Sequence, residues 1–208
     1  MGAVKTSGEN ANGVVYGRGL KKSLQNRFAT YLCRIRGGIY MVKIRKAFSD
    51  EVEMLRQQRI EAYEEHAQNI PEGHWEALKK SIASNADEQK DVELLVAELD
   101  GEVVGSVALF PAKSDAYKGL VDMLDYPEIR MLAVTPQSRG RGVAEALIKE
   151  CIRRTKAKGL QSIGLHTADF MKSAMRLYER MGFVRMPQFD FQPADDGIIV
   201  KAYRLSIE

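Results

Sequence analysis

Apolar and polar positions from residue 41 onward follow two alternating periods, one of two residues and one of three to four. Runs with the short period predict strands, and longer runs with apolar residues every third or fourth position predict helices. We expect strands at Val42–Ala47, Leu94–Glu98, Glu102–Phe110, Glu128–Val134, Ser162–His166, Phe183–Phe191 and Ile198–Ile207. We expect helices at Glu51–Gln68, Trp75–Ile82, Val143–Lys158 and Lys172–Met181. This region has the length of one domain.

Residues that favour turns and helix ends separate these elements. Asp100-Gly101 parts two Val-rich runs, and this dipeptide readily takes the positive φ values of a tight hairpin turn. Gly159 and Gly182 follow the last two predicted helices, where glycine commonly ends a helix. A longer polar connection, 111–127, precedes the strand at Glu128–Val134.

Residues 1–40 differ from the rest and form a basic leader, separate from a predicted domain at 41–208. The first 17 residues are rich in Gly, Asn and Ser, which is typical of disorder. Apolar residues then recur at helical spacing among basic ones, at Leu24, Phe28, Leu32 and Ile35. The leader is therefore expected to be disordered or partly helical. It could be a targeting peptide, a surface helix, or an upstream region preceding a true start at Met41, since the codons before Met41 can hold a ribosome-binding sequence.

The leader also accounts for the net charge of +3. It holds seven basic residues and one acidic residue, hence +6, which leaves 24 bases against 27 acids, or −3, in the remainder. Because the body of the protein is slightly acidic, we expect no nucleic-acid partner.

The composition is that of an ordinary globular protein, with 45% apolar and 28% charged residues. No apolar run has the 18 or more residues of a membrane span, so no membrane partner is expected. Cys33 and Cys151 are too few and too far apart for a disulfide framework, which favours a cytoplasmic location. His66 and His74 have no ligand partner at helical spacing, so we predict no metal.

The segment with the clearest chemistry is the loop at 137–142, between a predicted strand and a predicted helix. Gly140 and Gly142 let backbone N–H groups approach an anion, the helix start adds unpaired N–H donors, and Arg139 and Arg141 add charge. A phosphate site is one interpretation, and a Gly-rich turn with solvated arginines is the other. The loop does not fit a P-loop, since Val143 follows its second glycine, nor a dinucleotide fingerprint, since Glu145 stands where a third small residue is needed.

This loop and a second motif resemble the GNAT superfamily of N-acetyltransferases. The loop reads Gln137-x-x-Gly140-x-Gly142, and Ala174-x-x-Leu177-Tyr178-Glu179-x-x-Gly182-Phe183 follows in the next helix. The order of elements over 41–208 is also similar to that family. The resemblance implies the α/β fold of the acyl-coenzyme A N-acyltransferases. In this fold the central sheet is mixed, and it would splay between the strands Glu128–Val134 and Ser162–His166.

The resemblance also implies where acetyl-coenzyme A binds. The strand would hold the pantetheine through the backbone of Leu132, Ala133 and Val134. The loop and helix start would hold the pyrophosphate through Gln137, Ser138, Arg139, Gly140, Arg141, Gly142, Val143 and Ala144. Many family members have Asn where this chain has Met171, so one contact to the cofactor is in doubt.

Three residues are candidates for moving protons. Tyr178 stands where the family often has a general acid, and its alternative role is an aromatic that fills the core. Glu128 and His166, at strand ends beside the splay, are the candidate bases, although a lone histidine there is commonly structural. Cys151 lies on the apolar face of a predicted helix, where a small buried hydrophobe is expected rather than an acyl acceptor.

The resemblance thus implies an N-acetyltransferase that transfers acetyl to a primary amine by direct attack in a ternary complex. The acceptor, a small molecule or a peptide amine, is not identified by these motifs. A non-catalytic acyl-coenzyme A sensor is the alternative, and Tyr178 favours the enzyme. Proteins of this kind are often dimers, so a homodimer stays open.

Overall fold

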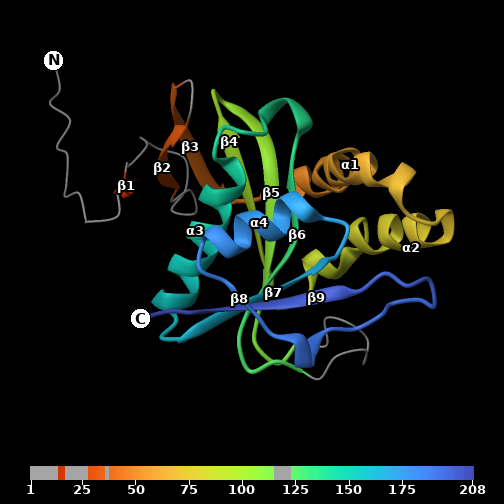
Figure 1. Ribbon diagram of the computed structural model, residues 1–208. Coiled ribbons are helices and arrows are strands. Elements are labelled where there is room, and N and C mark those ends of the chain that lie inside the picture. The colour runs from red at the N-terminus through yellow and green to blue at the C-terminus, as the bar shows by residue number, and fades with distance from the viewer. Residues whose placement is uncertain (1–13, 17–27, 36–37, 115–122) are drawn as a thin grey trace, which may run out of the picture.

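The computed structural model of the chain describes residues 14–16, 28–35, 38–114 and 123–208. Within these ranges one sheet of nine strands, in the order β1-β2-β3-β4-β5-β6-β7-β9-β8, is covered by four α-helices (Figure 1). The strands are β1 Val14–Tyr16, β2 Ala29–Ile35, β3 Gly38–Lys46, β4 Glu93–Leu99, β5 Glu102–Phe110, β6 Glu128–Val134, β7 Ser162–Ala168, β8 Val184–Arg185 and β9 Val200–Ser206. The α-helices are α1 Val52–Tyr63, α2 Glu72–Ile82, α3 Val143–Ala157 and α4 Lys172–Arg180. Short 3-10 helices are η1 Ser49–Glu51, η2 Glu64–Asn69, η3 Asn85–Glu88, η4 Pro136–Ser138 and η5 Pro187–Phe189.

The sheet is mixed, which confirms the predicted α/β fold. Among the paired strands that the structure describes, β6 and β7 run parallel and all other neighbours run antiparallel. A parallel pair needs a crossover, and α3 provides it between β6 and β7. No helix in the described ranges is both long enough and apolar enough to cross a bilayer.

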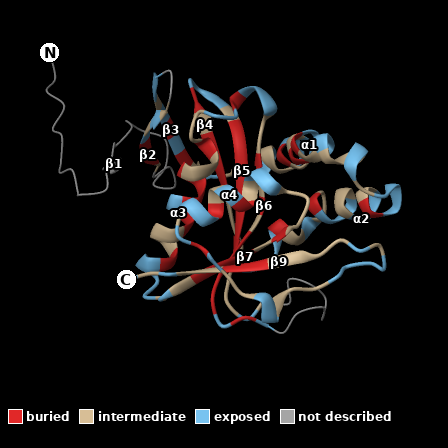
Figure 2. Cartoon of the chain, in the orientation of Figure 1, coloured by how far each residue is buried: buried red, intermediate tan, exposed pale blue. Residues whose placement is uncertain are grey.

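Both faces of the central strands are covered, and β5 shows this most clearly. Val107 and Leu109 pack into a core cluster with α3 and α4, whereas Ala108 and Phe110 face a second, smaller cluster on the other side. Side chains alternate between faces with a period of two, so a strand covered on both sides reads as a continuous apolar run. Figure 2 shows the buried positions along these central strands.

A β-bulge interrupts the pairing of β5 with β6. Ala108 lies opposite Arg130 and Ser106 lies opposite Ala133, so two residues of β6 oppose a single residue of β5. The first of these two residues, Met131, has φ +54°, a left-handed conformation that is unusual for a residue with a side chain. A bulge bends its strand and increases the local twist. The bend turns the second half of β6 away from its other neighbour, β7.

The sheet consequently splays between β6 and β7, as predicted. The two strands pair only at Glu128 with Gly164 and at Ile129 with Leu165, although each strand has seven residues. Beyond the bulge, the residues of β6 up to Val134 have no strand beside them on that edge. The backbone groups that point to this open edge are therefore available to a bound molecule, apart from the Leu132 carbonyl, which accepts a hydrogen bond from Tyr63.

A buried arginine lies beneath the bulge. Arg59 of α1 has no exposed surface, and its guanidinium donates to the Ile82 carbonyl at 2.9 Å and to Asp87 at 2.6 Å. The same group contacts the sulfur of Met131 at 3.3 Å. Breaking a buried ion pair is costly because it leaves an uncompensated charge. This network therefore fixes α1 to the strained position of β6.

The prediction of a helix between residues 24 and 35 is wrong where the structure describes the chain. Residues 29–35 form β2, which pairs with β3 along its whole length. Ala29 and Tyr31 are buried whereas Leu32 is exposed, which is the alternation of a strand. The expectation that the leader lies outside the sheet is therefore also wrong. Residues 1–13 and 17–27 of the predicted leader lie outside the described residues.

The strand predicted at Phe183–Phe191 is also wrong over most of its length. Within this segment β8, of two residues, and an isolated bridge at Phe191 pair with β9, and η5 lies between them. Pro187 opens η5, and proline cannot donate a backbone hydrogen bond to a strand ladder. The segment was predicted as a strand because its apolar residues outnumber its single proline.

Candidate active site

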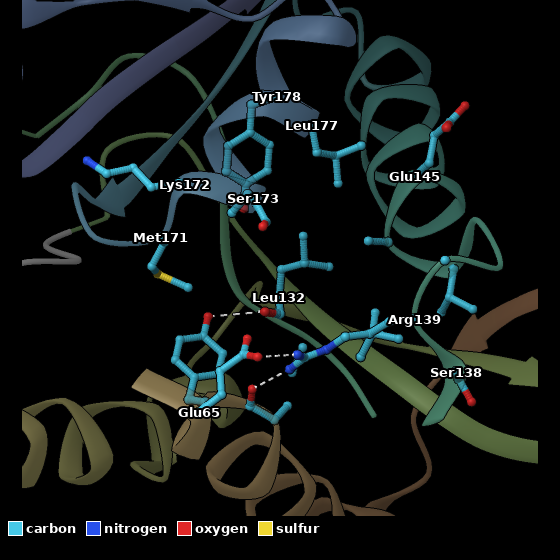
Figure 3. Close-up of a pocket in the computed structure, with 18 of the residues that line it drawn as sticks. Glu65, Leu132, Ser138, Arg139, Glu145, Met171, Lys172, Ser173, Leu177 and Tyr178 are labelled. Carbon is cyan, nitrogen blue, oxygen red and sulfur yellow. Dashed lines mark hydrogen bonds and ion pairs between the residues drawn. The ribbon is translucent and has the colours of Figure 1, made fainter. Parts of the chain in front are cut away.

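A cavity of about 660 Å³ occupies the opening between β6 and β7. Its walls come from five places: the second half of β6, the loop before α3 with the start of that helix, α4 with the residues before it, the end of α1 with η2, and the end of β2. Figure 3 shows side chains from these elements directed into the same space. Segments far apart in the sequence thus meet where the bulge opens the sheet.

The structure brings most of the predicted cofactor residues together at this cavity. Those that line it are Leu132, Ala133, Val134, Ser138, Arg139, Gly140, Gly142, Val143 and Ala144. Gln137 and Arg141 are not part of its wall. The Arg141 guanidinium instead lies 5.8 Å from the centre of the Tyr40 ring, at a distance that allows a cation–π contact.

The start of α3 has the properties of an anion site. Gly142 is the residue before the helix, with φ +80°, and the first helical hydrogen bond runs from the Ala146 N–H to the Gly142 carbonyl at 2.9 Å. The N–H groups between these residues have no partner within the helix, and they carry the positive end of the helix dipole. Gly140 also has positive φ, and a Cβ there would meet nothing within 4 Å. The loop therefore presents open space and N–H donors to a ligand.

The leader strand β2 packs against this anion site. A Cβ on Gly142 would lie 2.6 Å from the Cβ of Cys33, and the Cys33 thiol is 3.6 Å from the Gly142 carbonyl. Burial, with a contribution from Glu145, raises the pKa of this thiol above its ordinary value, so it stays protonated at neutral pH. Ile35, at the end of β2, lines the cavity. A segment predicted to lie outside the domain is thus part of the wall.

A buried hydrogen bond also fixes β2 to α3. The Tyr31 hydroxyl donates to a carboxylate oxygen of Glu150 at 2.7 Å, and Glu150 is completely buried. Burial alone would raise the pKa of Glu150, but hydrogen bonds from Arg153 and Tyr31, together with the charge of Arg154, hold it below its ordinary value. Glu150 is therefore ionised, and a hydrogen bond to an ionised group is stronger than a neutral one.

Arg139 joins two walls of the cavity. Its guanidinium donates to the Ala62 carbonyl at 2.7 Å and to Glu65 at 2.5 Å, as the dashed lines in Figure 3 show. Arg139 precedes α3, whereas Ala62 ends α1 and Glu65 is in η2. The arginine was predicted to supply charge to a phosphate, and in the structure it also holds the end of α1 against the loop.

Tyr178 projects from α4 into the cavity (Figure 3). Its ring packs 6.0 Å from Phe183 and 6.3 Å from Tyr203, centre to centre. No hydrogen-bond partner for its hydroxyl is found among the described residues, so the group is available to a ligand in the cavity. Burial, and secondarily the neighbouring Tyr63, raises the pKa of Tyr178 well above its ordinary value. The phenol is thus held in its protonated form, ready to donate.

A second tyrosine, which the sequence reading did not select, shares this cavity. Tyr63 ends α1 and lines the wall, and its hydroxyl donates to the Leu132 carbonyl at 3.1 Å. Burial raises its pKa to about 12. The Tyr63 hydroxyl thus donates to the backbone of β6. The Tyr178 hydroxyl makes no such bond among the described residues.

Glu128 and His166 bind each other rather than the cavity. His166 Nδ1 lies 2.7 Å from a Glu128 carboxylate oxygen, and its Nε2 lies 3.1 Å from the Phe189 carbonyl. Both side chains are almost fully buried, at 4% and 2% exposed, and neither lines the cavity. Both ring nitrogens of His166 thus have partners within the protein. A catalytic role for either residue stays a prediction.

Of the two other residues considered in the sequence, Met171 lies at the cavity and Cys151 lies in the core. Met171 lines the cavity, and its thioether cannot donate a hydrogen bond there. Cys151 is completely buried in the core cluster, and burial raises the pKa of its thiol. A buried, protonated thiol away from the cavity is no acyl acceptor, which agrees with the predicted packing role.

A model of the Acetyltransferase (GNAT) family matches residues 52–183. The chain belongs to this family. The matched segment runs from the start of α1 to the residue before β8, so it includes the bulge, the splay and every helix around the cavity. It excludes β2, although β2 packs against the loop before α3.

Curated relatives with similar sequences are named as N-acetyltransferases. Probable N-acetyltransferase family 8 member 5 of Mus musculus is 36% identical over 94 residues, which are 45% of this chain and 39% of that protein. N-acetyltransferase 8F1 of Rattus norvegicus is 34% identical over 93 residues, 45% of this chain and 40% of that protein. The chain spans about two fifths of the length of the curated relatives it matches.

Solved structures share the fold of this GNAT protein. An acetyltransferase of the GNAT family from Staphylococcus aureus Mu50 superposes with a TM-score of 0.59 at 14% identity, covering 80% of this chain and 99% of that one. The PaiA N-acetyltransferase from Thermoplasma acidophilum, solved in complex with coenzyme A, superposes with a TM-score of 0.58 at 16% identity, covering 79% and 99%. At such low identity these likenesses establish the fold.

Proposed function

We propose that this GNAT protein is an N-acetyltransferase that moves acetyl from acetyl-coenzyme A to a primary amine by direct attack in a ternary complex. The observation that carries the proposal is one cavity that joins the splayed edge of β6, the unpaired N–H groups of α3 and the Tyr178 hydroxyl. The first two features suit a long, anionic thioester, and the third suits the departure of a thiolate. Family membership supports the same assignment.

The residues present fit acetyl-coenzyme A. The N–H groups at the start of α3, the open space at Gly140 and the positive φ of Gly142 would receive the pyrophosphate. Those backbone groups of Leu132, Ala133 and Val134 that point to the open edge and have no partner would pair with the amide groups of the pantetheine; the Leu132 carbonyl is already bonded to Tyr63. Lys172 and Arg180 also line the cavity and add positive charge. When bound, the thioester supplies an acetyl group activated for transfer to nitrogen.

Tyr178 would donate the proton that the leaving sulfur takes up. A phenol whose pKa is raised by burial is a weak acid in water. A sulfur buried beside Tyr178 is likewise disfavoured as a thiolate, which makes it a stronger proton acceptor there. The pKa values of the phenol and of the leaving thiol are therefore raised together. Proton donation as the C–S bond breaks is a common form of general acid catalysis.

The remaining assignments are also part of this proposal. Two free cysteines, Cys33 and Cys151, are consistent with a cytoplasmic location. Metal independence stays a prediction; no cluster of three or more metal-binding side chains occurs in the described ranges. We propose no nucleic-acid or membrane partner, and a homodimer stays open.

The experiment that tests the proposal is an acceptor screen that monitors release of the free coenzyme A thiol. The purified chain is incubated with acetyl-coenzyme A and, separately, spermidine, lysine and a short peptide with a free N-terminus. We expect thiol release that depends on one class of amine, with an N-acetylated product seen by mass spectrometry. Tight coenzyme A binding with no transfer to any amine in an extended panel would instead support the sensor.

Gly140→Asp should weaken coenzyme A binding at least tenfold. The new carboxylate would enter the open space at the loop and repel the pyrophosphate. Gly159→Asp is the matched control, because Gly159 has nearly the same φ, +74° against +72°, also faces open space, and lies at the other end of α3. Calorimetry should show weaker binding for the first variant and unchanged binding for the second. Equal affinities would remove the loop from the binding site.

A further inference from the structure

The wall of the cavity formed by η2 contains a histidine held between aromatic rings. The centre of the His66 ring lies 5.2 Å from that of Phe170 and 6.4 Å from that of Tyr63. Phe170 also contacts His74, whose Nδ1 lies 2.6 Å from an Asp196 carboxylate oxygen. These contacts fix the imidazole of His66 at the cavity wall, across β6 from the start of α3.

The other ionisable groups of the cavity are poor proton acceptors at neutral pH. The two tyrosines are protonated, and Arg139, Lys172 and Arg180 are cations. Glu65 lies 2.5 Å from Arg139, and Glu145 lies 2.7 Å from Lys149, so both carboxylates are already paired. His66 is the histidine among the lining residues. The sequence-selected candidates Glu128 and His166 line no part of this wall.

From this placement, and resting on the proposed acetyltransferase function, we infer that His66 is the general base that deprotonates the ammonium group of the acceptor. His66 takes one proton from the acceptor nitrogen, whose lone pair then forms the C–N bond as the C–S bond breaks. The sulfur takes a proton from Tyr178, and the second proton of the nitrogen restores the phenol. His66 passes its proton to solvent, so one proton is released per turnover.

The surroundings of His66 keep the imidazole neutral. Burial lowers its pKa below the ordinary value of 6.5, and the charge of Arg139 acts in the same direction, while Glu65 opposes them. Lys172, which lines the same cavity after β7, adds positive charge, and Tyr63 and Phe170 against the ring are uncharged. A neutral imidazole carries one lone pair, as a base requires at pH 7. Because Nε2 lies 3.6 Å from a Glu65 carboxylate oxygen, the tautomer with its hydrogen on Nε2 leaves that lone pair on Nδ1.

The test compares His66→Gln with wild type, using whichever of spermidine, lysine or the peptide is acetylated. The variant should lose about 10²-fold in kcat/KM at pH 7 with unchanged coenzyme A affinity. In wild type kcat/KM should fall as pH drops below 6.5, since His66 must be deprotonated. This fall should be absent from the variant, whose rate should approach that of wild type at high pH, where the acceptor amine is already neutral.

Two further variants distinguish a catalytic role of His66 from a structural defect and from a catalytic role of Glu128. In His66→Ala, added imidazole should restore part of the lost rate, which a purely structural defect would not allow. Glu128→Gln should keep the acid limb of the pH profile. The inference is overturned if His66→Gln stays within about threefold of wild type, or if only Glu128→Gln abolishes the limb. A wild-type chain that transfers acetyl to no amine would instead overturn the proposed function.

Discussion

Replacing Tyr178 with Phe should lower turnover by about 10² to 10⁴ fold while coenzyme A affinity changes little. The substitution removes one hydroxyl and keeps the ring that packs against Phe183 and Tyr203. An acid that acts only as the C–S bond breaks contributes to the transition state and not to binding, so kcat should fall without a matching change in the dissociation constant. Steady-state kinetics and calorimetry measure the two quantities.

Two other tyrosines provide matched controls. Tyr63→Phe removes a hydroxyl from the same cavity, but that hydroxyl is bonded to the Leu132 carbonyl, so we expect a smaller loss than for Tyr178→Phe. Tyr203→Phe removes a hydroxyl that lies 3.2 Å from Glu179 and outside the cavity wall, so activity should stay within about threefold of wild type. A larger loss from Tyr63→Phe would move the acid to that residue, and activity retained by Tyr178→Phe would exclude the proposed acid.

The pattern of the sequence predicted the parts of the fold that depend on local signals. The hairpin at Asp100-Gly101 and the helix after Gly142 appear as β4–β5 and α3, because turn residues and helix starts act over a few positions. The predicted anion loop is built from the same local signals. The bulge at Met131 has no such signal, since its left-handed conformation is imposed by the neighbouring strand and by Arg59 rather than by the residue itself.

The sequence did not indicate the contact between His66 and Phe170 at the cavity wall, because this part of the wall is assembled from distant segments. His66 and Phe170 are about 100 residues apart in sequence, and each one alone reads as an ordinary surface or core residue. Glu128 and His166 were chosen because both lie at strand ends near the splay. The structure shows why position alone misleads, since their side chains pair with each other and are buried.

The secondary structure of the leader also could not be predicted from local sequence patterns. Apolar residues three and four apart among basic ones suit a helix, but they suit an antiparallel strand when every second side chain of that strand is buried. The strand is favoured over the helix by the hydrogen bond from Tyr31 to Glu150, a residue 119 positions away in the sequence. The start considered at Met41 would fall inside β3, which begins at Gly38. We therefore propose that β2 is part of the folded domain.

A chain that begins at Met41 should be less stable than the full chain by at least about 3 kcal/mol. The truncation removes the burial of the Tyr31 ring, which contributes about 2 kcal/mol, and a hydrogen bond to an ionised carboxylate, which contributes about 1.5 to 3 kcal/mol. In a domain of this size that loss lowers Tm by roughly 6 to 12 °C. Coenzyme A binding should weaken too, because Cys33 and Ile35 no longer support the loop at Gly142.

A chain that begins at Phe28 is the control that separates β2 from the rest of the leader. It lacks the same basic N-terminal residues but keeps every contact that β2 makes with α3, so its melting temperature and coenzyme A affinity should stay close to those of the full chain. If both truncated chains melt and bind alike at full-length values, β2 contributes neither to stability nor to the cavity, and the domain begins at Met41. If only the shorter chain is impaired, the wall beside Gly142 belongs to the cofactor site. Tyr31→Phe in the full chain should then reproduce part of the stability loss, because it removes the hydrogen bond to Glu150 and leaves the strand in place.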